Sequence, residues 1–168
     1  MADKAISNLS ASILLDEIKA NISGSLNYEP AVAIAPSAGE GWVYAEKSVA
    51  YNSNTQILGT TSPASDFIGQ QGAAVDADLI MWIAIKNTST TATDGICISL
   101  ASGSTPAYNL ATGIFIGAGE IVVLKLGNVT GANLIARSVT MDGTYGYPSA
   151  AHTGTVSAIA AAIVKNVG

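Results

Sequence analysis

The chain has 168 residues and a net charge of −5, with 49% apolar and only 11% charged residues. That length allows one domain with a proper core and is too short for two ordinary domains and a linker. The charged fraction lies far below the roughly one quarter that is usual in soluble domains, so the chain either enters a membrane or covers its surface against other chains.

The residue pattern predicts no membrane-spanning helix and disfavours direct nucleic-acid binding. The longest uninterrupted apolar stretches, Leu79–Ile85 and Ala158–Val164, have seven residues each, whereas a spanning helix needs roughly 18 to 20. The seven Lys and Arg residues are scattered singly, and nucleic-acid binding requires clustered basic residues. The start of the sequence lacks the basic region and apolar core of a secretory signal, so we expect synthesis in the cytoplasm.

The N-terminal residues are expected to form a short helix and an arm. The pattern predicts an amphipathic helix over Ser10–Ala20, with an apolar face made by Ile6, Leu9, Ile13, Leu14 and Ile18. The stretch that follows mixes Gly, Pro, Ser and Asn, a composition typical of an irregular arm. We therefore divide the chain into a helix and arm over 1–40 and a β-domain over 41–168.

From Trp42 onward the sequence predicts strands, because short runs rich in Val, Ile, Trp and Tyr alternate with turn-forming residues. The expected strands are Trp42–Tyr51, Leu79–Lys86, Gly95–Ala101, Thr112–Ile116, Glu120–Leu126, Ala132–Thr140 and Thr155–Lys165. The alanines of the last segment also suit a helix, and strand is preferred. Without amphipathic helices between them, these strands predict an all-β fold, an antiparallel β-sandwich of jelly-roll-like type.

The expected strand at Leu79–Lys86 is apolar on both of its faces. In an antiparallel sandwich one face of a strand normally meets water. Burial of both faces indicates either a central strand covered by the arm or a contact between subunits. Together with the low charge, this favours a homo-oligomer closed by symmetry, a dimer or a trimer.

Three closely spaced glycines, Gly113, Gly117 and Gly119, raise the possibility of a phosphate-binding loop. A dinucleotide loop requires a third glycine where Val122 stands and a helix after it. The residues that follow Glu120 are rich in β-branched side chains and have no helical period, so no helix is expected there. We therefore predict a turn over Gly117–Glu120 between two antiparallel strands.

No catalytic or metal-binding constellation stands out, so we predict neither an enzyme nor a cofactor. The sole histidine, His152, has no nucleophile motif beside it, and the sole cysteine, Cys97, has the setting of a core residue. Zinc sites of the usual kinds need more His and Cys residues. A calcium site would have to use Asp76 and Asp78 with Asp66 or Asp94, and these lack the spacing of a calcium loop. No catalytic, cofactor or metal residue is assigned.

A β-sandwich that binds carbohydrate or a receptor is the alternative function. Tyr145 and Tyr147, in "GTYGYP", are the most loop-like aromatic residues, and aromatic side chains with a polar end are common at binding surfaces. They would form the ligand-binding tip. Tyrosines that pack on a neighbouring subunit are the competing interpretation.

The segment Asp78–Thr140 resembles β-sandwich virion proteins of tailed bacteriophages, especially capsid decoration (cement) and head-fibre proteins. The likeness lies in a strand ending in "IKNTS", a strand "ICISL", a turn and strand "GAGEIVVL" and a closing strand "NLIARS".

The resemblance implies a non-enzymatic subunit, often a trimer, made in the bacterial cytoplasm and bound to the major capsid protein or another virion protein. We expect the N-terminal helix and the two tryptophans to make these contacts, through Ile13, Leu14, Ile18, Trp42 and Trp82.

Overall fold

The computed structural model describes ten segments of the chain, and extended strands form their regular structure. The segments are 5–14, 19–28, 41–51, 54–58, 79–100, 113–127, 129–130, 133–141, 148–149 and 154–165. The chain divides into two compact units, Met1–Ile34 and Ala35–Gly168. Within the described segments, no helix has the length and apolar character needed to cross a membrane.

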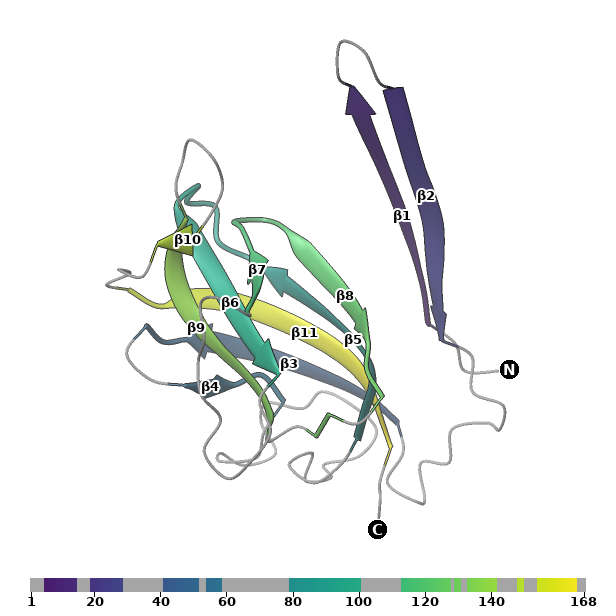
Figure 1. Ribbon diagram of the computed structural model, residues 1–168. Coiled ribbons are helices and arrows are strands. Elements are labelled where there is room, and N and C mark those ends of the chain that lie inside the picture. Colours follow the sequence, from purple (N-terminus) through teal and green to yellow (C-terminus); the bar gives the residue numbers. More distant parts are fainter. Residues whose placement is uncertain are drawn as a thin grey trace. The chain divides into compact units, whose positions relative to one another are not determined.

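The N-terminal unit contains an antiparallel hairpin (Figure 1). Strand β1 spans Ala5–Leu14 and strand β2 spans Lys19–Tyr28. Their pairing is continuous from Ala5↔Tyr28 to Leu14↔Lys19.

The predicted N-terminal helix over Ser10–Ala20 is therefore wrong at the positions that the structure describes. Both segments have apolar residues at alternate positions with Ser and Asn between them, and this period of two belongs to a strand. Ser and Asn also compete with the helical backbone for hydrogen bonds. Ile18, one of the predicted contact residues, lies outside the described residues.

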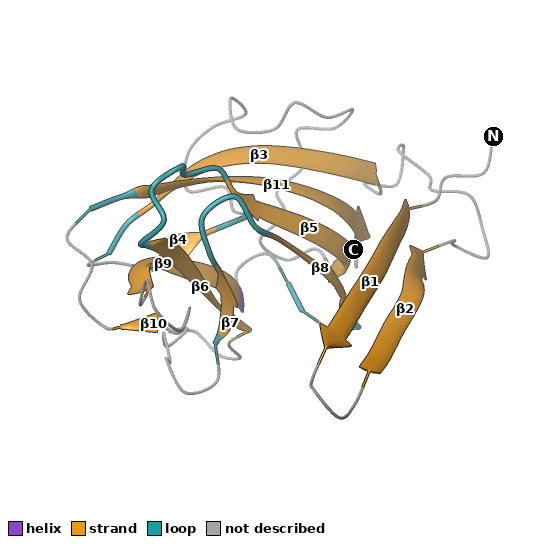
Figure 2. Cartoon of the chain, turned by 90° about the horizontal axis from the view of Figure 1, so that it is seen from above, coloured by secondary structure: helices purple, strands orange, loops and turns teal. Residues whose placement is uncertain are grey.

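The second unit contains two antiparallel sheets, seen as two layers in Figure 2. The first sheet has the order β3-β11-β5-β8, and the second has the order β10-β9-β6-β7 with β4 also paired to β9. The strands are β3 (Gly41–Val49), β4 (Thr55–Gln56), β5 (Leu79–Asn87), β6 (Asp94–Leu100), β7 (Ile114–Ile116), β8 (Ile121–Lys125), β9 (Leu134–Met141), β10 (Pro148–Ser149) and β11 (Val156–Lys165).

All seven predicted strands are found, with bounds that differ by a few residues. The preference for strand over helix in the last segment is confirmed, since β11 pairs with β3 on one side and β5 on the other. The two-residue strands β4 and β10 were not predicted, because two residues carry no periodicity.

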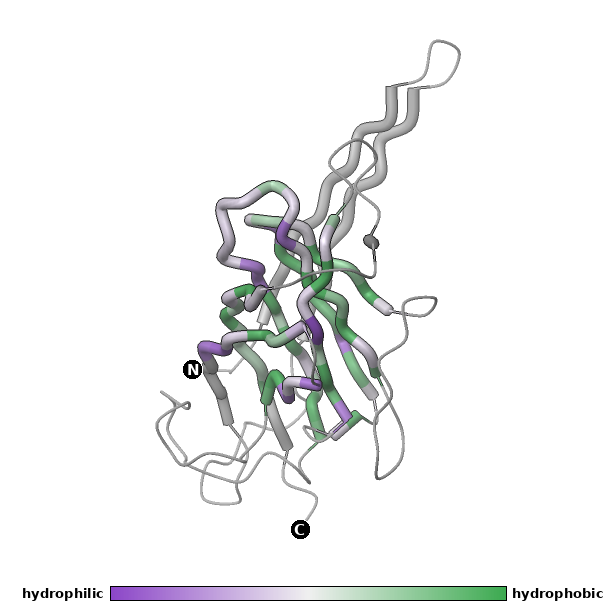
Figure 3. The backbone as a smooth tube through the Cα atoms, turned by 90° about the vertical axis from the view of Figure 1, so that its left-hand side faces the viewer, coloured by the Kyte–Doolittle hydropathy of each residue, from purple (hydrophilic) through white to green (hydrophobic). Residues whose placement is uncertain are grey.

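One core joins the two sheets. Its buried residues come from strands of both layers, and each is at most 2% exposed. The principal members are Ile83 and Ile85 of β5, Ile96 and Ile98 of β6, Ile116 of β7, Leu134 of β9, and Ala158, Ala160 and Ala162 of β11. Figure 3 shows the apolar residues concentrated along these strands, with polar residues gathered at the connections. Burial of the apolar side chains is the main stabilising contribution.

Strand β5 is buried on its core-facing side and only in part on the opposite side. Ile83 and Ile85 are fully buried in the core, and Trp82, on the opposite face by alternation, is only 7% exposed. The strand is also central in its sheet, between β11 and β8. On the outer face Trp82 is buried, Ala84 is partly exposed and Lys86 is exposed, so burial on both faces is limited to the level of Trp82.

Candidate functional site

The Gly117–Glu120 segment is a turn, as predicted. The Glu120 N–H donates to the Gly117 carbonyl at 3.1 Å, and the Glu120 carboxylate accepts from the Gly117 N–H at 2.7 Å. Gly119 has a φ of 74°, a left-handed conformation that glycine adopts without steric cost. The turn does not join paired strands, however: β7 pairs with β6 and β8 pairs with β5, so the chain crosses here from one sheet to the other.

Asn87, at the end of β5, holds this crossing in place. It is fully buried, and its side-chain N–H groups donate to the carbonyls of Asp94 at 2.9 Å and Ile116 at 3.3 Å. Its side-chain oxygen accepts from the Ser89 N–H at 2.9 Å. Its backbone also bonds to Gly119 and Glu120 of the turn. One amide thus ties together the ends of β5 and β7 and the start of β6.

Cys97 is a core residue, as predicted, and is fully buried. It belongs to a second apolar cluster with Val139 and Met141, against which Phe115 packs. Gly95 makes room for this cluster, because a Cβ there would lie 2.5 Å from Met141 Cγ. The cysteine is therefore inaccessible in the folded chain.

The described residues contain no group of three or more His, Cys, Asp or Glu side chains suited to a metal ion. Asp94, one of the residues considered as a calcium ligand, accepts a hydrogen bond from the Ser89 hydroxyl at 2.6 Å. The other acidic residues considered for calcium and the histidine lie outside the described residues: Asp66, Asp76, Asp78 and His152.

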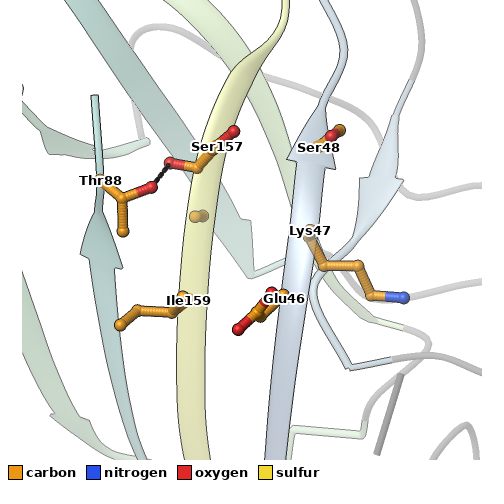
Figure 4. A pocket seen from close by; sticks show the side chains of 7 residues that line it. Glu46, Lys47, Ser48, Thr88, Ser157 and Ile159 are labelled. Atoms are coloured by element: carbon orange, nitrogen blue, oxygen red, sulfur yellow. Dashed lines mark hydrogen bonds between the residues drawn. The ribbon is translucent and has the colours of Figure 1, made fainter. Parts of the chain in front are cut away.

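A polar pocket of about 200 Å³ lies on the β3-β11-β5-β8 sheet (Figure 4). The register places Ser157 opposite Ser48, and Ile159 opposite Glu46. Because Ala158 and Ala160 of β11 fill the core, the alternating Ser157 and Ile159 belong to the outer face of the sheet. The complete lining is Glu46, Lys47, Ser48, Thr88, Ser157, Ala158 and Ile159.

The pocket combines a fixed loop with polar side chains. The Thr88 hydroxyl donates to the Ser157 carbonyl at 3.0 Å, and the Thr88 N–H donates to the same carbonyl at 2.9 Å, which fixes the loop after β5 against β11. A carboxylate accepts hydrogen bonds, and serine hydroxyls both donate and accept them. Glu46 and Ser48 thus provide directional polar groups beside the apolar Ile159.

The hairpin register separates its residues into two chemically different faces. Residues paired across an antiparallel ladder share a face, and successive residues alternate between faces. One face carries Ala5, Ser7, Leu9, Ala11, Ile13, Ala20, Ile22, Gly24, Leu26 and Tyr28; the other carries Ile6, Asn8, Ser10, Ser12, Leu14, Lys19, Asn21, Ser23, Ser25 and Asn27. We call the first set the apolar hairpin face. It has no charged residue.

The predicted contact residues fall in both units. Ile13 and Leu14 are consecutive in β1 and so lie on opposite faces of the hairpin, with Ile13 on the apolar hairpin face. Trp42 in β3 and Trp82 in β5 both pair with Ile163 of β11, so the structure brings the two tryptophans to the same level of the sheet. Tyr145 and Tyr147 lie outside the described residues.

The pocket was not predicted from the sequence. Its residues come from three segments that are far apart in the chain, and none of these segments carries a local motif. The apolar hairpin face did have a signal. Alternation of apolar residues with Ser and Asn is visible in both segments, but we assigned its apolar residues to a helical period.

Comparisons with known proteins identify no relative. No protein-family model, curated protein or solved structure gives a significant match to the chain.

Proposed function

We propose that this chain is a structural protein of a tailed-bacteriophage virion, a capsid decoration or cement subunit that binds the shell and stabilises it. The observation that carries the proposal is the apolar hairpin face, which belongs to a unit of its own. Its partners would be copies of itself and the major capsid protein or another virion protein. The chain would be made in the host cytoplasm and reside in the virion.

The hairpin supports this proposal because, among the described strands, β1 and β2 pair only with each other, and a two-stranded sheet by itself is at best marginally stable in water. Burying Leu9 and Ile22 on a partner would contribute about 1.5 to 3 kcal/mol each. The proposed docking element is accordingly this strand pair, in place of the helix expected from the sequence.

The second unit supports the proposal through its strand order. Taking β3 to β9 and β11 as the eight successive strands, the sheets read 1-8-3-6 and 2-7-4-5, and we propose that the unit is a β-sandwich of jelly-roll type. Jelly rolls serve as viral capsid and lectin domains. Because a fold alone does not determine function, the hairpin remains the decisive element.

Point substitutions on the two hairpin faces test the docking role. We expect Leu9→Asn and Ile22→Asn each to weaken binding to phage particles at least tenfold, since about 1.4 kcal/mol corresponds to a factor of ten. The matched control is Ser10→Asn on the opposite face. Co-sedimentation of purified protein with particles lacking the chain measures binding. Equal binding by all these variants would exclude the apolar hairpin face as the docking surface, and failure of the parent chain to bind would reject the cement role.

The polar pocket favours one alternative, a carbohydrate-binding module of a phage fibre or tail. Sugar hydroxyls would donate to Glu46 and exchange hydrogen bonds with Ser48. A glycan array identifies a ligand, and Glu46→Gln should reduce its binding about tenfold, the loss expected for one charge-assisted hydrogen bond. Glu120→Gln, at an exposed turn outside the pocket, is the control. Unchanged binding by Glu46→Gln would remove the pocket from consideration.

A further inference from the structure

Strand β8 is the last of the described strands at one side of the four-stranded sheet. Among the described strands it pairs with β5 alone. Each of its five residues is at least partly exposed, and Ile121 is 60% exposed. An apolar edge strand with unpaired backbone groups is a template for pairing with another chain.

We infer that β8 pairs with β8 of a second copy, antiparallel about a two-fold axis perpendicular to the sheet. This inference does not depend on the proposed virion function. The faces of β8 are distinct, because Val122 and Leu124 pack against the core while Ile121, Val123 and Lys125 alternate with them on the outer face. Such an axis continues each face of one sheet into the same face of the other.

The register between the two copies of β8 follows from the face on which each residue lies and from the length of the strand. Paired residues must share a face, and the pairing that uses all five residues of β8 on both chains has Val123 on the axis. Val123 then lies opposite the partner's Val123, and Ile121 lies opposite the partner's Lys125. The aliphatic part of a lysine can cover an apolar neighbour while its charge stays in water. No two lysines are directly opposed in this arrangement.

The contact between the two β8 strands is small, so we expect it to be weak. Two five-residue strands bury less than the roughly 800 Å² per partner of a standard interface. We therefore expect a concentration-dependent dimer with a dissociation constant in the micromolar range or weaker. Additional contacts made by the same copies in an assembly would raise the effective concentration of one edge near the other.

Cysteine cross-linking of the full chain tests the register. Directly opposed residues have Cα atoms roughly 4.5 to 5.5 Å apart, within disulfide reach, whereas the two copies of residue 121 would be roughly 14 Å apart and out of reach. Under mild oxidation we expect Val123→Cys to form covalent dimers at least tenfold faster than Ile121→Cys. The native Cys97 is fully buried, and the parent chain serves as the blank.

The control is stringent, because residue 121 is the more exposed position and would react faster in random collisions. Equal rates at the two positions, or a faster rate at 121, would overturn the inference. Native mass spectrometry over a concentration series supplies a second measurement. The parent chain and Val123→Thr should dimerise, while Val123→Lys, which opposes two charges on the axis, should stay monomeric. Dimerisation of Val123→Lys at the parent's concentration would also contradict the pairing.

Discussion

At the scale of single residues, Asn87 fixes the connection between the two sheets through its hydrogen bonds. It begins an Asn-x-Ser sequon, and its full burial makes the folded side chain inaccessible to a glycan. A buried amide is tolerated when its donors and acceptor are satisfied. Here both donors and the acceptor are satisfied by backbone groups of Asp94, Ile116 and Ser89. Asn87 therefore specifies how the two sheets are connected.

Replacing Asn87 with leucine should lower the free energy of unfolding by about 3 kcal/mol. The substitution keeps the volume similar but leaves two carbonyls and one N–H without the partner they now have. An unsatisfied buried group costs about 1 to 3 kcal/mol, and the low end applies because the bonds to Asp94 and Ser89 are only partly buried. For a domain of this size we expect the melting temperature to fall by roughly 6 to 12 °C. Thr90→Ala, at an exposed position of the same loop, should change it little. A loss below 1 kcal/mol for Asn87→Leu would show that water replaces these bonds.

At the scale of elements, the sequence identified strands where tertiary burial and local pattern agree. Runs such as Leu79–Asn87 are rich in β-branched residues and lie in the core, so propensity and burial point to one structure. In the hairpin, Ile13 and Leu14 are adjacent and match a helical stripe as well as a strand. The ten-pair ladder with β2 decides between the two, and pairing with a distant segment is not a property of either segment alone.

The candidate sites show the same limit. The polar pocket unites Glu46 and Ser157, which are more than a hundred positions apart in the sequence, through the β3–β11 register. Only the sheet order makes them neighbours. The turn at Gly117–Glu120 was predictable because its glycines and its hydrogen bonds are local. The placement of β7 and β8 in different sheets was not predictable from the sequence. The residues of a turn do not determine which strands the flanking segments pair with.

At the scale of the whole molecule, the described core lies within one of the two units. The members of the shared core run from Val49 to Ala162, inside Ala35–Gly168. In the N-terminal unit, β1 and β2 pair with each other. Under the proposed function, docking would use the hairpin, which lies outside this described core.

Removal of residues 1–34 should therefore leave a cooperatively folding domain. Because the core formed by the described side chains belongs to the second unit, we expect the 35–168 fragment to melt within about 4 °C of the full chain, a change of no more than about 1 to 2 kcal/mol. Calorimetry measures the transition, and limited proteolysis of the full chain should yield a resistant fragment that begins near residue 35. A variant with Leu9→Asn and Ile22→Asn serves as the full-length control, since it alters the apolar hairpin face without shortening the chain. If the fragment lost its cooperative transition while this variant retained it, the hairpin would be part of the folding unit, and its availability as a docking element would be refuted.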